Sequence, residues 1–377
     1  MDYINDFEND SHAQQTERIT ELSKRGYQLL KENSVTDAVS CFKKILDLDK
    51  TNNYALVGMG DAARKHNQFR DAISYYERCL ERYPGNNYAL FGLADCFKAL
   101  NQYHKAIEIW EKYLEHDEKN VTVLTRVADA YRKLHDFKNS KIMYQKVLTV
   151  EEFNPYAIIG LGHLHYDFKE YRDALFYWER MLERRNMATV DIRVLTSIGN
   201  CHRKLKTFDD GIAYFDAAIQ REPSNFYALF GLADCFRGLN QPIRSLEYWN
   251  RILELDPRNK VILTRAGDAY CTLKDYEKAV GCYHRALAID FDTYAVLGLA
   301  IVDREQGRYE QALSAFRSLL STDPKNHRVY IEIAHCYIKM NDTEGALAVL
   351  KEFLCFGIKN NTINDLLQNL ETGRLPL

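Results

Sequence analysis

The chain has 377 residues, and its 50 basic and 53 acidic residues give a net charge of −3, which excludes a general electrostatic attraction to nucleic acid or anionic membranes. No stretch approaches the roughly eighteen consecutive apolar residues that a membrane-spanning helix needs. The nine cysteines include no Cys-x-x-Cys pair, which argues against a disulfide framework or zinc site, and with no secretory signal they predict a cytoplasmic protein.

Residues 1–18 precede the regular part of the chain and carry five acids and one base. This composition predicts a flexible acidic arm. Two interpretations of the arm are open. It is a plain disordered terminus, or its Tyr3, Ile4 and Phe7 dock it on its own molecule or on a neighbouring one, which would lead to self-association.

Residues 19–360 are self-similar. The eleven residues Tyr88 to Lys98 recur as Tyr227 to Arg237 with ten identical positions. A second motif, Leu-Thr-Arg, ends at Arg126 and at Arg265. Aligning all copies gives a period of 34 residues. We place ten repeats at 19–52, 53–86, 87–120, 121–154, 155–191, 192–225, 226–259, 260–292, 293–326 and 327–360.

Within each repeat, apolar residues recur with the spacing of two short amphipathic helices. Counted from the first residue of each repeat, position eight is always Gly or Ala, and position twenty is always small. Position twenty-four is bulky, and it is aromatic in every repeat except the last, where it is Leu350. Helices this short are marginal alone, so we expect stacking of neighbouring repeats to stabilise them.

This pattern, with Pro at position thirty-two in four repeats, resembles the tetratricopeptide repeat family over about residues 19–360. The resemblance implies an all-α, right-handed superhelical solenoid of about ten helix-turn-helix repeats. Residues 361–377 would then form a capping helix and a C-terminal tail. The seventh repeat departs from the pattern at Pro242, which we expect to start its second helix.

In this family the first helices line a concave groove, to which positions two, five, six, nine, twelve and thirteen contribute. Five repeats combine Tyr at position two with Gly at position six, although Gly in a helix costs about 1 kcal/mol relative to Ala. Two explanations are open. Either the helices approach closely and a Tyr of an adjacent repeat covers the gap, or the glycines form a notch for a ligand beside an aromatic wall. The pairs are Tyr54 with Gly58, Tyr88 with Gly92, Tyr156 with Gly160, Tyr227 with Gly231, and Tyr294 with Gly298.

Position nine is often Asp and position twelve often basic, and four repeats pair the two at i, i+3. These pairs predict either a self-neutralising ladder or a polar track for an extended peptide. Repeats four to six are the most basic at groove positions, so we expect an acidic partner segment there, with solvated helix faces as the alternative. The lysine-based clamp with which some family members bind chaperone tails is absent, since position five is never Lys.

The sequence therefore predicts a non-catalytic scaffold or adaptor that binds a peptide or helix of another protein in the groove. A nucleic-acid-binding helical solenoid is the alternative, although paired Asp and Arg would repel phosphate as often as attract it. No enzymatic motif occurs, and His163 and His165 at i, i+2 are not a metal pair, so we expect no cofactor and no metal. The predicted partner-binding residues are Tyr88, Asp95, Arg126, Asp129, Arg132, Tyr156, Arg193, Asn200, Arg203, Tyr227, Asp234 and Arg237.

Overall fold

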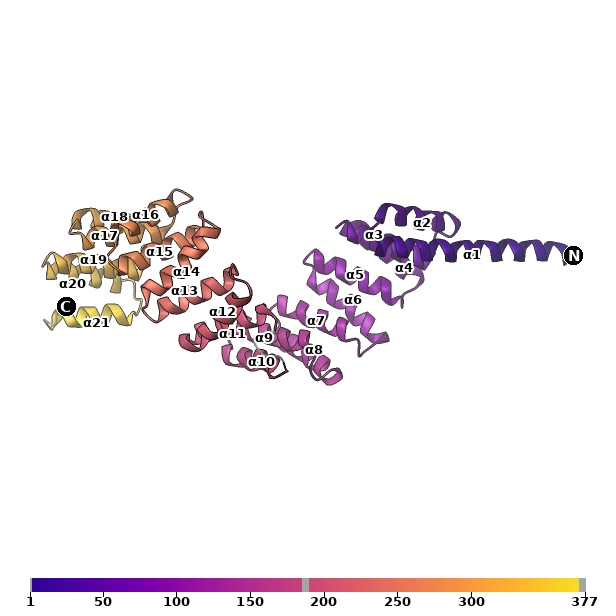
Figure 1. The fold of residues 1–377 in the computed structure, drawn as a ribbon, viewed down its shortest axis with the longest axis horizontal. Coiled ribbons are helices and arrows are strands. Elements are labelled where there is room, and N and C mark those ends of the chain that lie inside the picture. The colour runs from indigo at the N-terminus through magenta and orange to yellow at the C-terminus, as the bar shows by residue number, and fades with distance from the viewer. Residues whose placement is uncertain (1, 185–189, 373–377) are drawn as a thin grey trace. The chain divides into compact units, whose positions relative to one another are not determined.

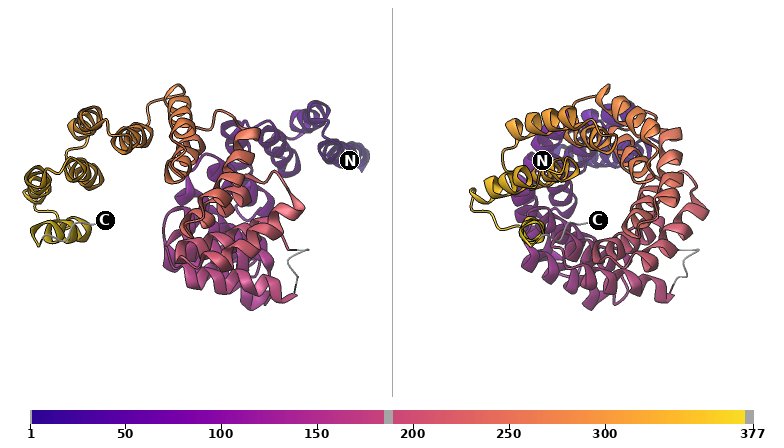
Figure 2. Two further views of the ribbon diagram at one scale, coloured as in Figure 1. Left: turned by 60° about the vertical axis from the view of Figure 1, so that its left-hand side comes forward. Right: turned by 90° about the vertical axis from the view of Figure 1, so that its left-hand side faces the viewer.

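The computed structural model describes residues 2–184 and 190–372, in which helices are joined by short turns and no strand occurs. The chain divides into two compact units, Met1–Arg184 (unit 1) and Arg185–Leu377 (unit 2). Within each unit the helices form hairpins that follow one another side by side (Figure 1, with further views in Figure 2). The structure therefore confirms an all-α solenoid of helical hairpins.

Among the described residues, each unit contains five hairpins, and from the second hairpin onward every first helix begins at the first residue of a predicted repeat. The helices of unit 1 are α1 (Asp2–Lys31), α2 (Val35–Leu48), α3 (Asn53–Lys65), α4 (Phe69–Arg82), α5 (Asn87–Ala99), α6 (Tyr103–His116), α7 (Val121–Lys133), α8 (Phe137–Val150), α9 (Pro155–Asp167) and α10 (Tyr171–Arg184). The helices of unit 2 are α11 (Ile192–Leu205), α12 (Phe208–Arg221), α13 (Phe226–Gly238), α14 (Pro242–Leu255), α15 (Lys260–Thr272), α16 (Tyr276–Leu287), α17 (Thr293–Glu305), α18 (Tyr309–Thr322), α19 (His327–Lys339), α20 (Thr343–Leu354) and α21 (Asn361–Glu371).

The two ends of the array differ from the internal hairpins. Helix α1 begins at Asp2, so residues 2–18, where the sequence predicts a flexible arm, form the first part of a long helix in the structure. Mobility and docking of this segment stay predictions. At the other end, α21 buries Ile363, Leu366 and Leu370 in the same core cluster as α18 to α20, which confirms the capping helix. The expected helix start at Pro242 is also confirmed.

Polar residues define the helix boundaries. In most repeats an Asn or Asp precedes the first helix, and its side chain accepts a backbone N–H of the first turn, as Asn86 does from Ala89 at 3.0 Å. The turn inside every hairpin carries a left-handed residue at position fifteen, most often Asn, which adopts this conformation more readily than most side chains. These residues are Asn33, Asn67, Asn101, His135, Lys169, Lys206, Asn240, Lys274, Gly307 and Asn341.

The aromatic ring at position twenty-four is the centre of each hairpin's packing. Tyr76 is fully buried, and its ring lies against the backbone of Gly60 at position eight of its own repeat and Gly92 at position six of the next. A Cβ atom built on either glycine would lie 2.5 Å or 2.3 Å from the ring, respectively, which is too close for any side chain. Phe215 lies in the same way between Gly199 and Gly231.

The glycines at position six are therefore packing sites, which decides between the two explanations left open by the sequence. In all five repeats a Cβ atom at this position would clash with the position-twenty-four ring of the preceding repeat. As expected, the ring that covers each glycine comes from an adjacent repeat, and it is a Tyr at Gly92, Gly160 and Gly298, but it stands at position twenty-four and not at position two. The ring comes from a second helix instead, because the second helix of one hairpin packs directly on the first helix of the next.

Candidate partner-binding surface

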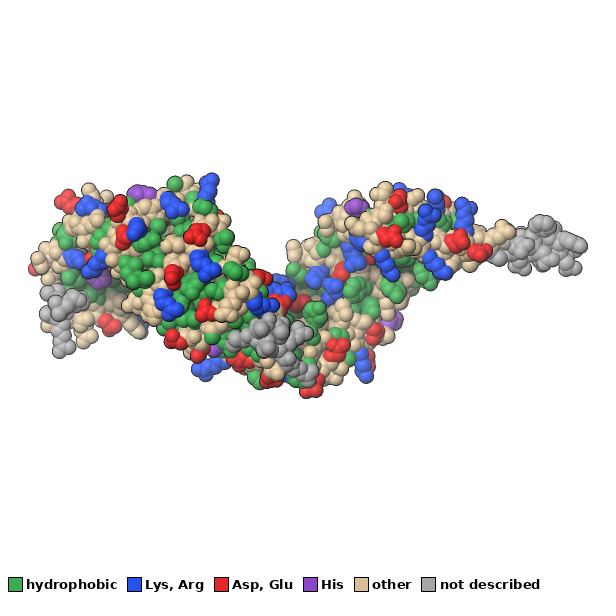
Figure 3. Space-filling view, in the orientation of Figure 1, with side chains coloured by type: hydrophobic (Ala, Val, Ile, Leu, Met, Phe, Trp, Pro, Cys, Tyr) green, Lys and Arg blue, Asp and Glu red, His purple; other side chains and the backbone are tan. Residues whose placement is uncertain are grey.

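The first-helix face is the surface of each unit that carries positions two, five, six, nine, twelve and thirteen of its first helices. In unit 1 it is formed by α1, α3, α5, α7 and α9, and in unit 2 by α11, α13, α15, α17 and α19. Successive first helices contact one another, as α3 does with α5 and α15 with α17. Figure 3 shows Lys and Arg interspersed with Asp and Glu on the side of each unit that is in view.

The position-two tyrosines are the most exposed aromatic side chains on this face. Their exposed fractions lie between 60% for Tyr54 and 80% for Tyr88, whereas the position-twenty-four rings are almost completely buried. The fold does not use these rings for its core. Large exposed rings of this kind favour contact with another molecule, because each can bury a large apolar area and still offer a hydroxyl group. The five are Tyr54, Tyr88 and Tyr156 in unit 1, and Tyr227 and Tyr294 in unit 2.

The first-helix face of unit 1 contains a hollow of about 650 Å³ between α1, α3 and the start of α5. Tyr54 and Tyr88 line it, together with Tyr27, whose hydroxyl donates to the Tyr54 carbonyl at 3.0 Å. Burial raises the pKa of Tyr27, so this phenol stays protonated. Lys24 and Lys31 also line the hollow, and neither forms an ion pair with any residue in the described part of the chain. Sequence reasoning did not select Lys24, Tyr27 and Lys31, although they stand at groove positions six, nine and thirteen, because the first repeat lacks the Tyr–Gly and Asp–basic combinations.

A chain of ion pairs crosses the repeats of unit 1. The guanidinium of Arg64 contacts Asp61 at 3.2 Å and Asp95, one repeat further on, at 2.9 Å. Asp95 also contacts Arg126 of the following repeat at 2.9 Å, although this contact is not aligned as a hydrogen bond. Arg126 in addition lies over the Phe91 ring, 4.9 Å from its centre. Asp95 and Arg126, two of the predicted site residues, are therefore brought together.

The predicted pairing within single helices is only partly correct. Asp61 pairs with Arg64 and Asp234 with Arg237, but Arg132 contacts Asp167 of the next repeat, at 2.6 Å, rather than Asp129. No ion pair between Asp95 and Lys98 occurs in the described structure. First helices of neighbouring repeats lie close enough for a long arginine to choose a carboxylate on either helix, which the spacing within one helix does not reveal.

Several position-nine aspartates accept a hydrogen bond from a buried tyrosine of the core. Where position twenty-four is Tyr, its hydroxyl donates to the Asp of the same hairpin, as Tyr144 does to Asp129 at 2.5 Å and Tyr283 to Asp268 at 2.9 Å. Tyr76 and Asp61 form the third such pair at 2.7 Å. Burial raises the pKa of Asp61 and of Asp268, and the hydrogen bonds from the tyrosines partly offset this. These aspartates have a structural role in addition to any contact with a ligand.

Asp234 is the one carboxylate of the predicted site in unit 2, and 6% of its surface is exposed. Its Oδ2 accepts from Arg203 at 2.7 Å, and its Oδ1 accepts from Nε and Nη2 of Arg237 at 2.9 and 2.7 Å. Asn200 supports this cluster by accepting from Nε of Arg203 at 3.2 Å. Burial alone would raise the pKa of Asp234, but the hydrogen bonds from Arg237 and Arg203 outweigh it and lower the pKa.

We expect Asp234→Asn to lower the stability of unit 2 by about 1–3 kcal/mol near neutral pH, because two guanidinium groups lose their charged acceptor. Since folding lowers this pKa, the stabilisation is complete above the unfolded-state pKa of about 3.9 and is lost as the pH falls through the folded-state pKa. The difference in melting temperature between the variant and the wild type should therefore shrink on acidification. Asp209→Asn, at an exposed carboxylate of α12, is the control. A pH-independent difference would contradict the assignment.

The basic stretch predicted in repeats four to six is largely neutralised. Two of its arginines lie in unit 1, where Arg126 pairs with Asp95 and Arg132 with Asp167. The other two lie in unit 2, where Arg203 pairs with Asp234, and exposed Arg193 pairs with Asp191 just before α11 at 2.6 Å. All four of these acids belong to a neighbouring repeat, and Asp95 and Asp234 lie outside repeats four to six, which is why a charge count within those repeats missed them. Tyr156 and Tyr227 remain exposed on the first-helix faces of unit 1 and unit 2.

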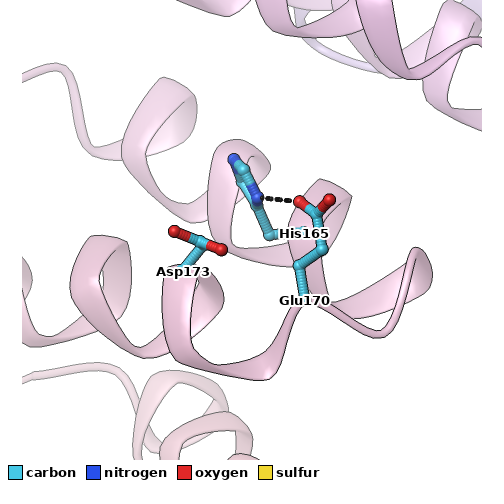
Figure 4. A group of neighbouring side chains, drawn as sticks. All are labelled: His165, Glu170 and Asp173. Carbon is cyan, nitrogen blue, oxygen red and sulfur yellow. Dashed lines mark hydrogen bonds and ion pairs between the residues drawn. The ribbon is translucent and has the colours of Figure 1, made fainter.

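One group of side chains has the composition of a metal site. His165, Glu170 and Asp173 offer ligand atoms that all lie within 4.8 Å of one another, and His165 is almost fully buried (Figure 4). However, Nδ1 of His165 bonds to Glu170 at 2.7 Å, and its ring stacks on Tyr177. His202 repeats this arrangement one repeat later, with Nδ1 on Thr207 and the ring on Tyr214. We therefore interpret His165 as a packing residue of the hairpin.

No helix in the described part of the chain is long and apolar enough to cross a membrane.

Comparison with known families agrees with this architecture. Four models of the tetratricopeptide repeat match residues 57–121, 121–154, 198–260, 262–293 and 303–353. The chain belongs to the tetratricopeptide repeat family, whose members generally mediate protein–protein interactions.

Curated relatives share only their repeat regions with this chain. It is 24% identical to the general transcriptional corepressor ssn6 of Schizosaccharomyces pombe over 148 residues, which are 38% of this chain and 13% of that protein. It is 23% identical to the tetratricopeptide repeat and J domain-containing co-chaperone DNJ1 of Fusarium oxysporum over 175 residues, 44% of this chain and 34% of that protein. The chain thus spans between about an eighth and a third of these relatives.

Solved structures with a similar fold include yeast Tom70, with a TM-score of 0.42 and 12% identity over 95% of both chains. The MamA protein aligns with a TM-score of 0.41 and 20% identity, over 46% of this chain and 92% of MamA.

Proposed function

We propose that this chain is a non-catalytic scaffold whose first-helix faces bind a peptide or helical segment of a partner protein. The exposed position-two tyrosines carry this proposal. Each lies at the start of a helix whose other side is packed in the core, so the ring is presented on a rigid support at little further cost in conformational entropy. The same array of first helices provides polar side chains next to the rings, which suits recognition of an extended chain.

The alternative of nucleic-acid binding is less well supported by the site. A phosphate backbone is attracted by arginines that are not already paired with carboxylates. On the first-helix face of unit 1, Arg64, Arg126 and Arg132 all contact aspartates. The exposed rings are interspersed with these neutralised pairs, and this combination of aromatic and balanced polar groups favours a protein ligand.

Capture of a partner from a cell lysate, followed by mass spectrometry, tests this function. We expect Tyr88→Ser combined with Tyr156→Ser to reduce recovery of the specific partner by about tenfold or more, because central aromatic contacts dominate many interfaces. The matched control is Phe176→Ser, which removes a ring that is 59% exposed but belongs to a second helix. Equal losses with both variants, at unchanged melting temperatures, would show that the first-helix face is not the binding surface.

A further inference from the structure

Arg126 and Arg265 occupy equivalent places in the two units. Each ends a Leu-Thr-Arg motif and stands at position six, where five other repeats have Gly. Each follows a repeat with Trp at position twenty-four, Trp110 or Trp249, whereas the glycines follow Phe or Tyr. The preceding first helices are the two nearly identical segments that begin at Tyr88 and Tyr227. Because the two arginines have nearly the same sequence around them and the same position in the repeat, a difference in their contacts can be traced to a few residues.

In unit 1 this arginine is ion-paired within the chain. Asp95 receives Arg64 on Oδ2 and Arg126 on Oδ1, both at 2.9 Å. The planar guanidinium of Arg126 also covers Phe91.

In unit 2 the equivalent acid, Asp234, is already occupied. Arg203 binds its Oδ2, as Arg64 binds that of Asp95, but Oδ1 is taken by Arg237 from the same helix. The Phe230 ring, equivalent to Phe91, has the Arg203 guanidinium 5.9 Å from its centre. Arg265 consequently forms no ion pair with any described residue.

This contrast coincides with one residue difference in the repeated segment. Among the eleven aligned positions only the last one differs, and it is Lys98 in unit 1 and Arg237 in unit 2. The fork of Arg237 reaches Oδ1 of Asp234 through both Nε and Nη2, a geometry that a lysine ammonium does not offer. Where lysine stands, Oδ1 remains accessible to the arginine of the next repeat.

Arg265 lines a cavity of about 350 Å³ on the first-helix face of unit 2. Arg237 from α13 and Arg328 from α19 line it as well, and Arg328 also lacks an ion pair among the described residues. Among the described residues that line it, Asp268 is the only one with a carboxylate, and it accepts a hydrogen bond from Tyr283. Because Arg237 is bound to Asp234, the two unpaired arginines, Arg265 and Arg328, face one carboxylate, and this leaves the cavity with an excess of positive charge.

We propose that this cavity binds an aspartate or glutamate side chain of a partner's peptide. The inference rests on the proposed function and names the chemistry that one part of the face recognises. A carboxylate can accept paired N–H bonds from a guanidinium, and the two unpaired arginines provide such donors. Tyr227 and Tyr294, both exposed at the starts of α13 and α17, can contact the neighbouring residues of the peptide.

The test is a titration that follows the arginine Nε–H signals of the full chain by NMR. The probes are a terminally blocked Ala-Glu-Ala-Glu-Ala peptide and its glutamine counterpart, and the signals are assigned with Arg265→Lys and Arg126→Lys. We expect the Arg265 signal to shift saturably with the glutamate peptide, and to respond about tenfold more weakly or not at all to the glutamine peptide. The Arg126 signal, at the matched position, should not move. Absence of a saturable shift at Arg265, or an equal shift at Arg126, overturns the proposal.

Two further measurements sharpen the result. Arg237→Lys conserves the charge but removes the paired N–H donors of the guanidinium. Arg265 should then form an ion pair with Asp234, and its NMR signal should no longer respond to the peptide. An unchanged response contradicts the role given to Arg237. Inorganic phosphate, added at matched ionic strength, should displace the peptide no better than chloride, and selective displacement would identify a phosphate site instead. If the Arg265 signal does not shift with the glutamate peptide while partner capture still depends on Tyr88 and Tyr156, the inference fails and the proposed function stands.

Discussion

Replacing Gly231 with leucine should destabilise unit 2 by about 3 kcal/mol, since overpacking a filled core typically costs 1–3 kcal/mol and here the obstacle is a whole ring. A Cβ atom at Gly231 would already lie 2.2 Å from the ring of Phe215, which is fully buried. Differential scanning calorimetry or urea unfolding, followed by circular dichroism, measures the loss.

Gly281 provides the matched control for this prediction. It lies in helix α16 of the same unit, it is exposed, and nothing would lie within 4 Å of an added Cβ atom. Gly281→Leu should raise stability by about 0.5–1 kcal/mol, because leucine is the better helix former. If both substitutions change stability by a similar amount, the position-six glycines are not packing sites. In unit 1, Gly162→Leu, directed at the buried indole of Trp178, should behave like Gly231→Leu.

Replacing Phe215 with alanine should destabilise unit 2 by about 3–5 kcal/mol, the range found for removing a large aromatic side chain from a core. Its ring is fully buried and lies between the backbones of Gly199 and Gly231, so its loss opens a cavity between two consecutive hairpins. Unfolding in urea, monitored by circular dichroism, should show a lower midpoint.

The double variant Phe215→Ala, Gly231→Leu tests the contact itself. Leucine at position 231 would enter the space that the ring leaves, so the losses of stability caused by the two substitutions should not add. We expect the double variant to lose about 1–3 kcal/mol less stability than the sum of the losses in the two single variants. Phe215→Ala combined with Gly281→Leu should be additive, because Gly281 is exposed and nothing lies near an added Cβ. Additive losses in the first pair would mean that the ring and the glycine do not share a packing site.

The two units show how a repeated segment acquires different surface chemistry. Their first helices around Asp95 and Asp234 are nearly identical, and the preceding arginines, Arg64 and Arg203, bind these acids in the same way. Lysine or arginine at position twelve then decides whether the next repeat's arginine is neutralised. The charge that such a surface presents therefore depends on competition for a few carboxylates rather than on the number of charged residues.

The first-helix face was only partly accessible to sequence reasoning. The exposed tyrosines followed from their repeat position, because position two precedes the packed part of the first helix. Lys24, Tyr27 and Arg328 stand at groove positions six, nine and two of their repeats, but they were not selected, since the first and last repeats lack the Tyr–Gly and Asp–basic combinations that guided the choice. Arg265 carried a signal, its shared motif with Arg126, but its unpaired state depends on a residue of another repeat.

The sequence by itself determined the period, the helical hairpins and the capping helix. These depend on local information, namely helical spacing of apolar residues, small residues at fixed positions and turn residues such as Asn101 that accept left-handed backbone conformations. Only the tertiary structure decided which ring fills the space at Gly92, and that Asp234 binds Arg203 of the preceding repeat in addition to Arg237 of its own helix. Both of these contacts join different helices, so distance and geometry between helices select the partner.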